Sequence, residues 1–282
     1  MIKLSARWIP IMEKLDCPNF TLTDKITPEQ ASYFSQHGVI KFNNFISQST
    51  VELLLEEVSR IEKKWIADGR DKVNGIPLKF GKDEYGNKTI QRFCFLSQES
   101  AILHDLLKDS RLQALIALLQ PYEGRIGEDE KDGLVLNNYL RTPNSSFSQM
   151  GWHTDCPRDF FLGQKIMPML NVGIHLDNCP YENGGLRVLL GTHKQNMLQL
   201  LFGKKYFVDH TPDPDEVGFD IKAGDLTVHD GRIWHRVQQS PHYGEKSRRR
   251  VMYVPIITGK YNPKSENSKT PLYHWFTRKV HR

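Results

Sequence analysis

Apolar residues near the N-terminus recur at the spacing of an α-helix, between residues that favour helix ends. Thr27 can cap a helix, Pro28 suits its first turn, and Glu29 places an acid where the helix dipole favours one. Gly38 can end the helix in a left-handed conformation. We therefore expect a helix from Pro28 to about Gln36.

Two further helical regions are expected. Leucines and valines group on one face of a helix over residues 51–67, with Ser47 or Ser49 as its N-cap and an Asp-Gly pair at its end. The leucines of residues 100–119 also recur at helical spacing. These helices would buttress a sheet.

The pattern changes to that of β-structure later in the chain. Residues 69–91 are polar and turn-rich, and residues 91–96 then alternate like a strand. From Leu134 onward, short β-like segments alternate with turns, which is typical of a barrel or sandwich. The turns are marked by Pro143, Asn183-Gly184, Pro212-Asp213-Pro214 and Ala223-Gly224-Asp225. We therefore expect an all-β core with flanking helices.

A single domain is expected from the length of 282 residues, because one barrel commonly occupies about 200 to 250. Residues 1–130 would form a mainly helical buttress with some strands, 131–260 the β core, and 261–282 a C-terminal tail. Residues 194–216 mix apolar side chains with an acidic, proline-bearing stretch. They can form a lid over an active site or a helical excursion packed on the wall.

The composition is that of a globular protein, for which we expect a cytoplasmic location. Hydrophobic residues make up 39% of the chain, and the mean hydropathy is −0.51. No stretch approaches the roughly 18 apolar residues of a membrane span, and the N-terminus lacks an apolar core of signal-peptide length. The four cysteines are scattered without a Cys-x-x-Cys pair, so we expect reduced thiols.

The charge balance favours a small-molecule substrate over nucleic acid. The 38 basic and 33 acidic residues are spread along the chain, and the net charge is only +5. No stripe of aromatic and basic residues indicates a nucleic-acid surface. An anionic substrate would explain the excess, and the candidates for a cationic mouth are Arg92, Arg158, Arg232 and Arg236. The oligomeric state is not indicated.

The motif with the most chemical content is His153-Thr154-Asp155. Residues i and i+2 of an extended segment point to the same side, so this histidine and this aspartate can bind one metal ion together. His235 lies in a distant segment rich in strand-forming residues and can supply a third ligand. Two imidazoles and one carboxylate on one face of Fe(II) leave open positions for a chelating cosubstrate and dioxygen.

A second pair with the same spacing, His175-Leu176-Asp177, competes for this role. Its segment runs directly into Glu182-Asn183-Gly184-Gly185, which predicts a strand leading to a tight turn. We therefore interpret the second pair as scaffold of a hairpin, and the first as the metal-binding pair.

The order of several motifs resembles one family. The motifs are His153-x-Asp155, Glu182-Asn183-Gly184-Gly185-Leu186-Arg187-Val188, Gly191-Thr192-His193-Lys194, Gly224-Asp225 and His235. This order is similar to that of the phytanoyl-CoA dioxygenase family of Fe(II)- and 2-oxoglutarate-dependent oxygenases, and the likeness runs from about Ile26 to about Pro255. It implies a double-stranded β-helix, or jelly-roll, buttressed by the N-terminal helices.

The resemblance also implies the ligand set. Iron would be bound by His153, Asp155 and His235, with His229 as the alternative to the last of these. The cosubstrate 2-oxoglutarate needs an arginine for its distal carboxylate, because the planar guanidinium can form two parallel hydrogen bonds. In the run Arg248 to Arg250, the family pattern points to Arg249, while either neighbour remains an alternative. Dioxygen is the second cosubstrate.

Three more polar residues are candidates for the cosubstrate site. Arg141 precedes the metal motif where relatives have a basic residue, although it can equally be a salt-bridged arginine at the rim. Asn171 lies on a strand just after the metal motif, and Thr192 lies in the Gly-Thr-His segment.

Asp155 indicates the type of oxidation, because related halogenases replace this carboxylate with a small residue so that a halide can bind the iron. We therefore expect hydroxylation of an unactivated C–H bond, with release of succinate and CO2. The alternatives are a cupin-like metal enzyme that does not use 2-oxoglutarate, and a non-catalytic ligand-binding barrel.

Overall fold

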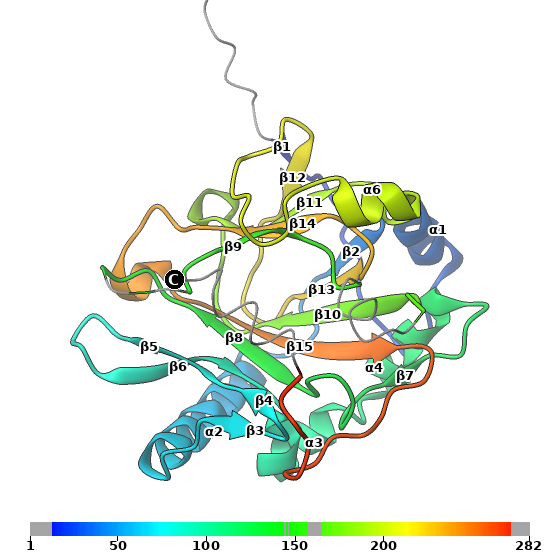
Figure 1. The fold of residues 1–282 in the computed structure, drawn as a ribbon. Helices are drawn as coiled ribbons and strands as arrows, with labels where there is room; N and C mark the ends of the chain where they lie inside the picture. Colours follow the sequence, from blue (N-terminus) through cyan, green and yellow to red (C-terminus); the bar gives the residue numbers. More distant parts are fainter. Residues whose placement is uncertain (1–12, 144, 146, 157–164, 272–282) are drawn as a thin grey trace, which may run out of the picture.

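The computed structural model describes residues 13–143, 145, 147–156 and 165–271, and two β-sheets dominate it (Figure 1). The smaller sheet has five strands in the order β1 (Glu13–Lys14), β12 (Glu216–Gly218), β11 (Gly185–Leu189), β14 (His235–Gln238) and β9 (Met150–His153). Only its β1–β12 pair is parallel. This sheet carries the histidines predicted to bind metal.

The larger sheet has eight strands. Its order is β2 (Val39–Phe42), β13 (Leu226–Asp230), β10 (Met169–His175), β15 (Arg249–Ile257), β8 (Val135–Tyr139), β6 (Lys88–Phe93) and β5 (Lys79–Lys82), with β7 (Arg125–Ile126) on β15. A separate ribbon pairs β3 (Lys72–Val73) with β4 (Ile76–Pro77). The expected β core with helices is confirmed, and β2, β5 and β6 join it from the N-terminal part.

The helices of the described residues are α1 (Pro28–His37), α2 (Gln48–Ala67), α3 (Ala101–Leu106), α4 (Ser110–Ala114) and α6 (Met197–Phe202), with short 3₁₀ turns η1 (Leu96–Glu99), η2 (Leu115–Leu119), η3 (Tyr181–Asn183), η4 (Thr192–Lys194) and η5 (Gly244–Ser247). The caps of the first two are confirmed. Thr27 accepts a hydrogen bond from the Gln30 backbone and Gly38 ends α1 at a φ of 76°, while Ser47 caps α2. No helix in the described ranges is long and apolar enough to cross a bilayer.

The helical region expected over residues 100–119 is broken into three short pieces, α3, α4 and η2. The break falls at Asp109, whose carboxylate accepts hydrogen bonds from the backbone and side chain of Arg111. An aspartate that bonds to the backbone in this way begins a new helix instead of continuing the previous one. The leucine spacing alone could not reveal this competition.

The strand expected over residues 91–96 is present as β6, but it begins and ends three residues earlier than expected. Its neighbour β5 was not predicted. The segment of β5, Lys-Phe-Gly-Lys, has the polar and glycine-containing composition of a loop. Its Gly81 has a packing reason, because a Cβ there would lie 2.4 Å from the Gln91 side chain. The glycine allows the two strands of this hairpin to approach.

The two faces of the larger sheet differ in polarity, as its central strand β15 illustrates. Met252, Val254 and Ile256 point outward into an apolar cluster that includes Leu54 and Trp65 of α2. The alternate positions point toward the smaller sheet, and on all strands they include many polar groups. These inner residues are Asn137, Tyr139, Asn171, His175, Thr227, His229, Arg249 and Tyr253. A sheet with a polar inner face indicates a functional site between the sheets.

Candidate metal centre and active site

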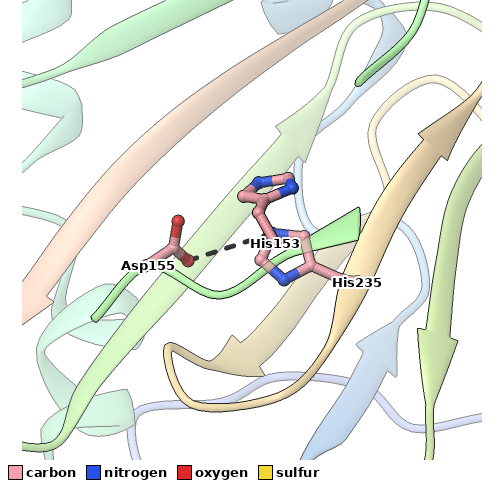
Figure 2. A group of neighbouring side chains, drawn as sticks. All are labelled: His153, Asp155 and His235. Carbon is pink, nitrogen blue, oxygen red and sulfur yellow. Dashed lines mark ion pairs between the residues drawn. The ribbon is translucent and has the colours of Figure 1, made fainter. Parts of the chain in front are cut away.

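Three predicted ligands converge between the sheets. His153 ends β9 and lies directly opposite His235, the first residue of β14, while Asp155 follows β9 by two residues. One donor atom from each of the three lies within 4.8 Å of the others, and the two imidazole centroids are 4.0 Å apart. Figure 2 shows the three side chains pointing toward one another.

The imidazoles are oriented by their own backbone. The Nδ1 atom of His153 lies 2.8 Å from the Gly151 carbonyl oxygen, and that of His235 lies 3.1 Å from the Ile233 carbonyl oxygen. Each Nδ1 can therefore donate its hydrogen to a carbonyl, which leaves Nε2 with a lone pair for a metal. Burial lowers the pKa of both histidines, so the neutral form that metal binding requires is favoured.

The carboxylate of Asp155 is held between the two sheets. Its Oδ2 atom accepts a hydrogen bond from the Asn171 amide at 3.2 Å and lies 4.0 Å from His235 Nε2. Burial alone would raise the pKa of Asp155, but the surrounding imidazoles outweigh it and hold that pKa well below its usual range. The side chain keeps 21% of its surface exposed, so the centre is open on this side.

His229 is the alternative third ligand, and the structure places it beside the three-residue cluster. Its Nε2 atom lies 3.6 Å from Asp155 Oδ2, which exceeds the usual hydrogen-bond range, and its ring centroid is 4.4 Å from that of His235. His229 is not part of the cluster that could hold a metal, which comprises His153, Asp155 and His235. His229 is 1% exposed, and neither ring nitrogen has a hydrogen bond within the described residues.

This donor set suits Fe(II). Two neutral imidazole nitrogens and one carboxylate oxygen approach from one side, which is the facial arrangement of non-haem iron oxygenases. The backbone carbonyls that fix both rings are the outer partners that metal-binding histidines usually have. The residues present therefore fit the ion that the resemblance implies.

The three consecutive arginines have different partners. Arg248 forms an ion pair with Glu245, and Arg250 forms an ion pair with Asp177 at 2.6 Å. Arg249 is 3% exposed and donates to two backbone carbonyls, those of Gln238 at 2.7 Å and Ser148 at 3.0 Å, and it also lies within hydrogen-bonding reach of the Cys179 thiol. Its Nε has no hydrogen bond, and no carboxylate of the described residues pairs with it. A buried guanidinium without a counter-ion is suited to an anionic ligand.

A pocket lies beside Arg249 between the two sheets. It is lined by Tyr139, His175, Asp177, Cys179, Gly185, Leu186, Ile221, Val237, Arg249, Arg250, Val251 and Tyr253. The three metal-ligand candidates are not among its walls. Tyr139 and Tyr253 link the two regions, because the charge of Asp155 acts on both phenols. Burial raises the pKa of Tyr139 to about 12, so it stays a neutral wall and hydrogen-bonding group.

The other predicted cosubstrate residues lie in three different settings. Asn171 is in the centre, bonded to Asp155. Arg141 is at the rim, where it donates to the Ser240 carbonyl at 2.6 Å and lies 4.1 Å from the ring centroid of Tyr243. The Thr192 hydroxyl donates to the Leu189 carbonyl and accepts from the Trp234 backbone, so it braces the turn before β14.

Three arginines proposed for a cationic mouth have carboxylate partners. Arg92 pairs with Asp132, Arg232 with Asp230, and Arg236 with Glu216. The fourth, Arg158, lies outside the described residues. These three positive charges are balanced within the chain, so they do not account for an anion-binding mouth.

The segment over residues 194–216 is attached to β9. Phe207 donates its backbone N–H to Trp152, and Trp152 donates to Asp209, so the segment continues the edge of the smaller sheet. The Phe207 ring stacks on His153 at a centroid distance of 5.0 Å. Gly151 allows this approach, because a Cβ there would lie 2.5 Å from the Phe207 carbonyl oxygen. The segment contains the short helix α6 and also reaches His153, so the choice between a lid and a helical excursion packed on the wall stays a prediction.

Sequence reasoning did not identify Lys79, Asn137, Tyr139 and Tyr253 as residues of the inner face near the site. Tyr139 and Asn137 share one side of β8, and Tyr253 shares one side of β15 with Arg249. A polar residue at every second position of an otherwise apolar strand was the available signal. Lys79 had no such signal, because its strand was not predicted.

Solved structures of other proteins have this fold. HygX from Streptomyces hygroscopicus, with nickel and 2-oxoglutarate bound, is 16% identical with a TM-score of 0.59 over 86% of this chain and 89% of its own. SnoK, a non-haem α-ketoglutarate-dependent carbocyclase from nogalamycin biosynthesis, is 14% identical with a TM-score of 0.60 over 92% and 93%. EctD from S. alaskensis, in its apo form, is 16% identical with a TM-score of 0.59 over 92% and 88%. At such identities the likeness concerns the fold.

The chain thus shares the fold of these proteins. The sequence profile of phytanoyl-CoA dioxygenase matches residues 34–249, and the chain therefore belongs to the phytanoyl-CoA dioxygenase family. It is an iron- and 2-oxoglutarate-dependent oxygenase, with Fe(II), 2-oxoglutarate and O2 as its cofactor and cosubstrates. The resemblance inferred from the motifs is confirmed. No curated protein sequence matches the chain.

Proposed function

We propose that this protein hydroxylates a C–H bond of a small-molecule substrate, with release of succinate and CO2. The observation that carries the proposal is Arg249, a buried cation on the sheet that faces His153 and His235, with which no carboxylate of the described residues pairs. A structural barrel would gain nothing from such a charge, whereas a dicarboxylate cosubstrate requires one. A metal enzyme that does not use 2-oxoglutarate would not need it either.

Each residue then has a defined task. His153, Asp155 and His235 hold Fe(II), and Asn171 fixes the rotamer of the aspartate by its hydrogen bond. Arg249 pairs with the distal carboxylate of 2-oxoglutarate, between the walls formed by Tyr139 and Tyr253. When bound, iron with 2-oxoglutarate and O2 supplies the oxidising power, and the protein positions the target carbon and limits water.

The remaining structural expectations are part of the proposal. The two sheets would form the double-stranded β-helix of the family, closed around the centre. The chain would act as one domain, because strands from its N-terminal part and from its core share one sheet. Arg141 and Thr192 would act on the cosubstrate indirectly, through the segments that they brace. Phe207 would form a fixed wall beside His153.

Anaerobic titration of the iron-loaded protein with 2-oxoglutarate tests this function. We expect the weak visible charge-transfer band of the iron chelate in the wild type, no band in His153→Ala, and a band that needs far more 2-oxoglutarate in Arg249→Ala. Arg248→Ala is the matched control and should titrate like the wild type, because Arg248 already pairs with Glu245. A wild type that binds iron but never develops the band would contradict the proposal.

A further inference from the structure

Lys79 is the starting point, a lysine on the inner face of the larger sheet. It pairs across the strands with Arg92, which pairs with Asn137, which pairs with Val251. Side chains of directly paired residues lie on the same face of a sheet. Val251 lines the pocket beside Arg249, so Lys79 belongs to the same interior surface as that pocket (Figure 1, strands β5, β6, β8 and β15).

Aromatic rings connect Lys79 to the proposed cosubstrate site. Its ammonium lies 4.5 Å from the ring centroid of Phe147, and that ring stacks on Tyr139 at 4.8 Å. Tyr139 in turn lies below the Arg249 guanidinium, 5.6 Å from its ring centroid to the guanidinium carbon. The two cations thus flank one pair of stacked rings that forms a continuous wall.

No anionic group of the described residues pairs with the ammonium of Lys79. Those residues offer it neither a hydrogen bond nor an ion pair, and it lies against the ring of Phe147. Arg92 on the next strand contrasts with it, because Asp132 balances that charge. Burial lowers the pKa of Lys79 to about 8, which agrees with a desolvated charge that nothing compensates. The side chain is nevertheless partly exposed, so a ligand can reach it.

Arg249 and Lys79 are thus two cations on one interior surface without carboxylate partners among the described residues, and each can bind an anionic group of a ligand. The proposed function assigns the distal carboxylate of 2-oxoglutarate to Arg249, and the proximal end of that molecule belongs at the metal. We propose that Lys79 binds an oxyanion group of the primary substrate, a carboxylate or a phosphate, and thereby positions the substrate for oxidation. This inference rests on the proposed function, because it assumes that 2-oxoglutarate occupies the Arg249 pocket.

The test uses sulfate as the probe and thermal unfolding as the readout, on anaerobic protein saturated with Fe(II) and 2-oxoglutarate at constant ionic strength. We expect sulfate to raise the melting temperature of the wild type saturably, by roughly 2 to 4 °C at ten times its dissociation constant. Lys79→Met should lose this shift. Lys82→Met, an exposed lysine on the same strand, should keep it.

The same variants separate a binding role from a structural one. Without sulfate, Lys79→Met should unfold at the same temperature as the wild type or higher, because the substitution removes a desolvated charge. A lower melting temperature without sulfate, together with an unchanged sulfate shift, would assign Lys79 to the scaffold and overturn the inference. The absence of a saturable shift in the wild type would overturn it as well.

Two additions make the outcome specific. Acetate and methyl phosphate in place of sulfate identify the preferred anion, since the larger saturable shift marks the group that the site accepts. Arg249→Met should keep the sulfate shift while it loses the charge-transfer band. A wild type without that band, but with a sulfate shift that depends on Lys79, would contradict the proposed function and leave the anion site standing.

Discussion

The chain contains two His-x-Asp pairs with identical spacing, and the structure gives them opposite surroundings. His153 and Asp155 leave their metal-binding atoms directed toward His235 and toward each other. His175 and Asp177 lie at the end of β10, on the opposite sheet, with their polar atoms committed to neighbours. The same three-residue pattern thus belongs to a candidate metal centre in one place and to paired scaffold residues in the other.

The partners of the second pair explain the difference. His175 Nε2 shares a hydrogen bond of 3.0 Å with the Thr227 hydroxyl, and Asp177 forms an ion pair with Arg250 at 2.6 Å. A histidine and an aspartate that already have such partners would lose them on binding a metal. The spacing of a motif therefore shows that two side chains can share an ion, while the groups opposite them decide whether they are available.

The largest contrast is expected in iron binding. His153→Ala should weaken Fe(II) affinity by more than about a hundredfold, since removal of a direct ligand costs more than removal of an outer partner. His175→Ala should bind one iron with the affinity of the wild type and should only be less stable. Anaerobic iron titration of both variants measures this, and equal loss in the two would remove the distinction between the pairs.

The neighbouring arginines extend the comparison to 2-oxoglutarate. Arg249→Ala should raise the dissociation constant of 2-oxoglutarate by roughly a hundredfold, the equivalent of about two charge-assisted hydrogen bonds. Arg250→Ala should change it little, because Arg250 is paired with Asp177. Calorimetric titration of the metal-loaded variants gives both constants. A larger effect at Arg250 would reverse the assignment.

Acid should destabilise the scaffold pair. Burial lowers the pKa of His175 from 6.5 to about 4. Between these values the unfolded chain binds the proton more readily, so the free energy of unfolding falls as pH drops from about 6.5 to about 4, by about 3 kcal/mol. His175→Gln should lose less stability over this range than the wild type.

Denaturant unfolding at several pH values measures this difference. The charged groups that act on His175 are Asp225 and Asp177, which favour its protonation, and Lys41 and His229, which oppose it. They remain in the variant, so the difference between the two curves isolates the imidazole. Parallel curves for both proteins would show that His175 does not titrate in this range.

The smallest effect on iron affinity is expected for two residues of β13, the strand that pairs with β10. His229 lies beside the first pair and Thr227 beside the second. His229→Leu should weaken iron affinity roughly tenfold, because it removes a group that packs against His235 and Asp155. Thr227→Val should leave iron affinity unchanged. If Thr227→Val weakened iron affinity more than His229→Leu, the neighbouring residues on β13 would not explain the difference between the two His-x-Asp pairs.

The sequence by itself determined the local features of this protein. Thr27, Gly38 and Ser47 define the helix ends that the structure has, because capping involves residues only three or four positions apart. The spacing of His153 and Asp155 was equally readable, since an extended backbone places alternate side chains on one side. The order of the motifs identified the family.

Tertiary structure decided which partners each of several similar candidates has. Arg249 differs from its neighbours because strand alternation turns it inward, where no carboxylate of the described part of the chain pairs with it, while Glu245 and Asp177 pair with the other two. Lys79 faces the same interior because β5 pairs with β6, and no local pattern in the sequence predicted that pairing. A side chain's partners come from strands far apart in sequence, so its free or committed state is a property of the folded chain.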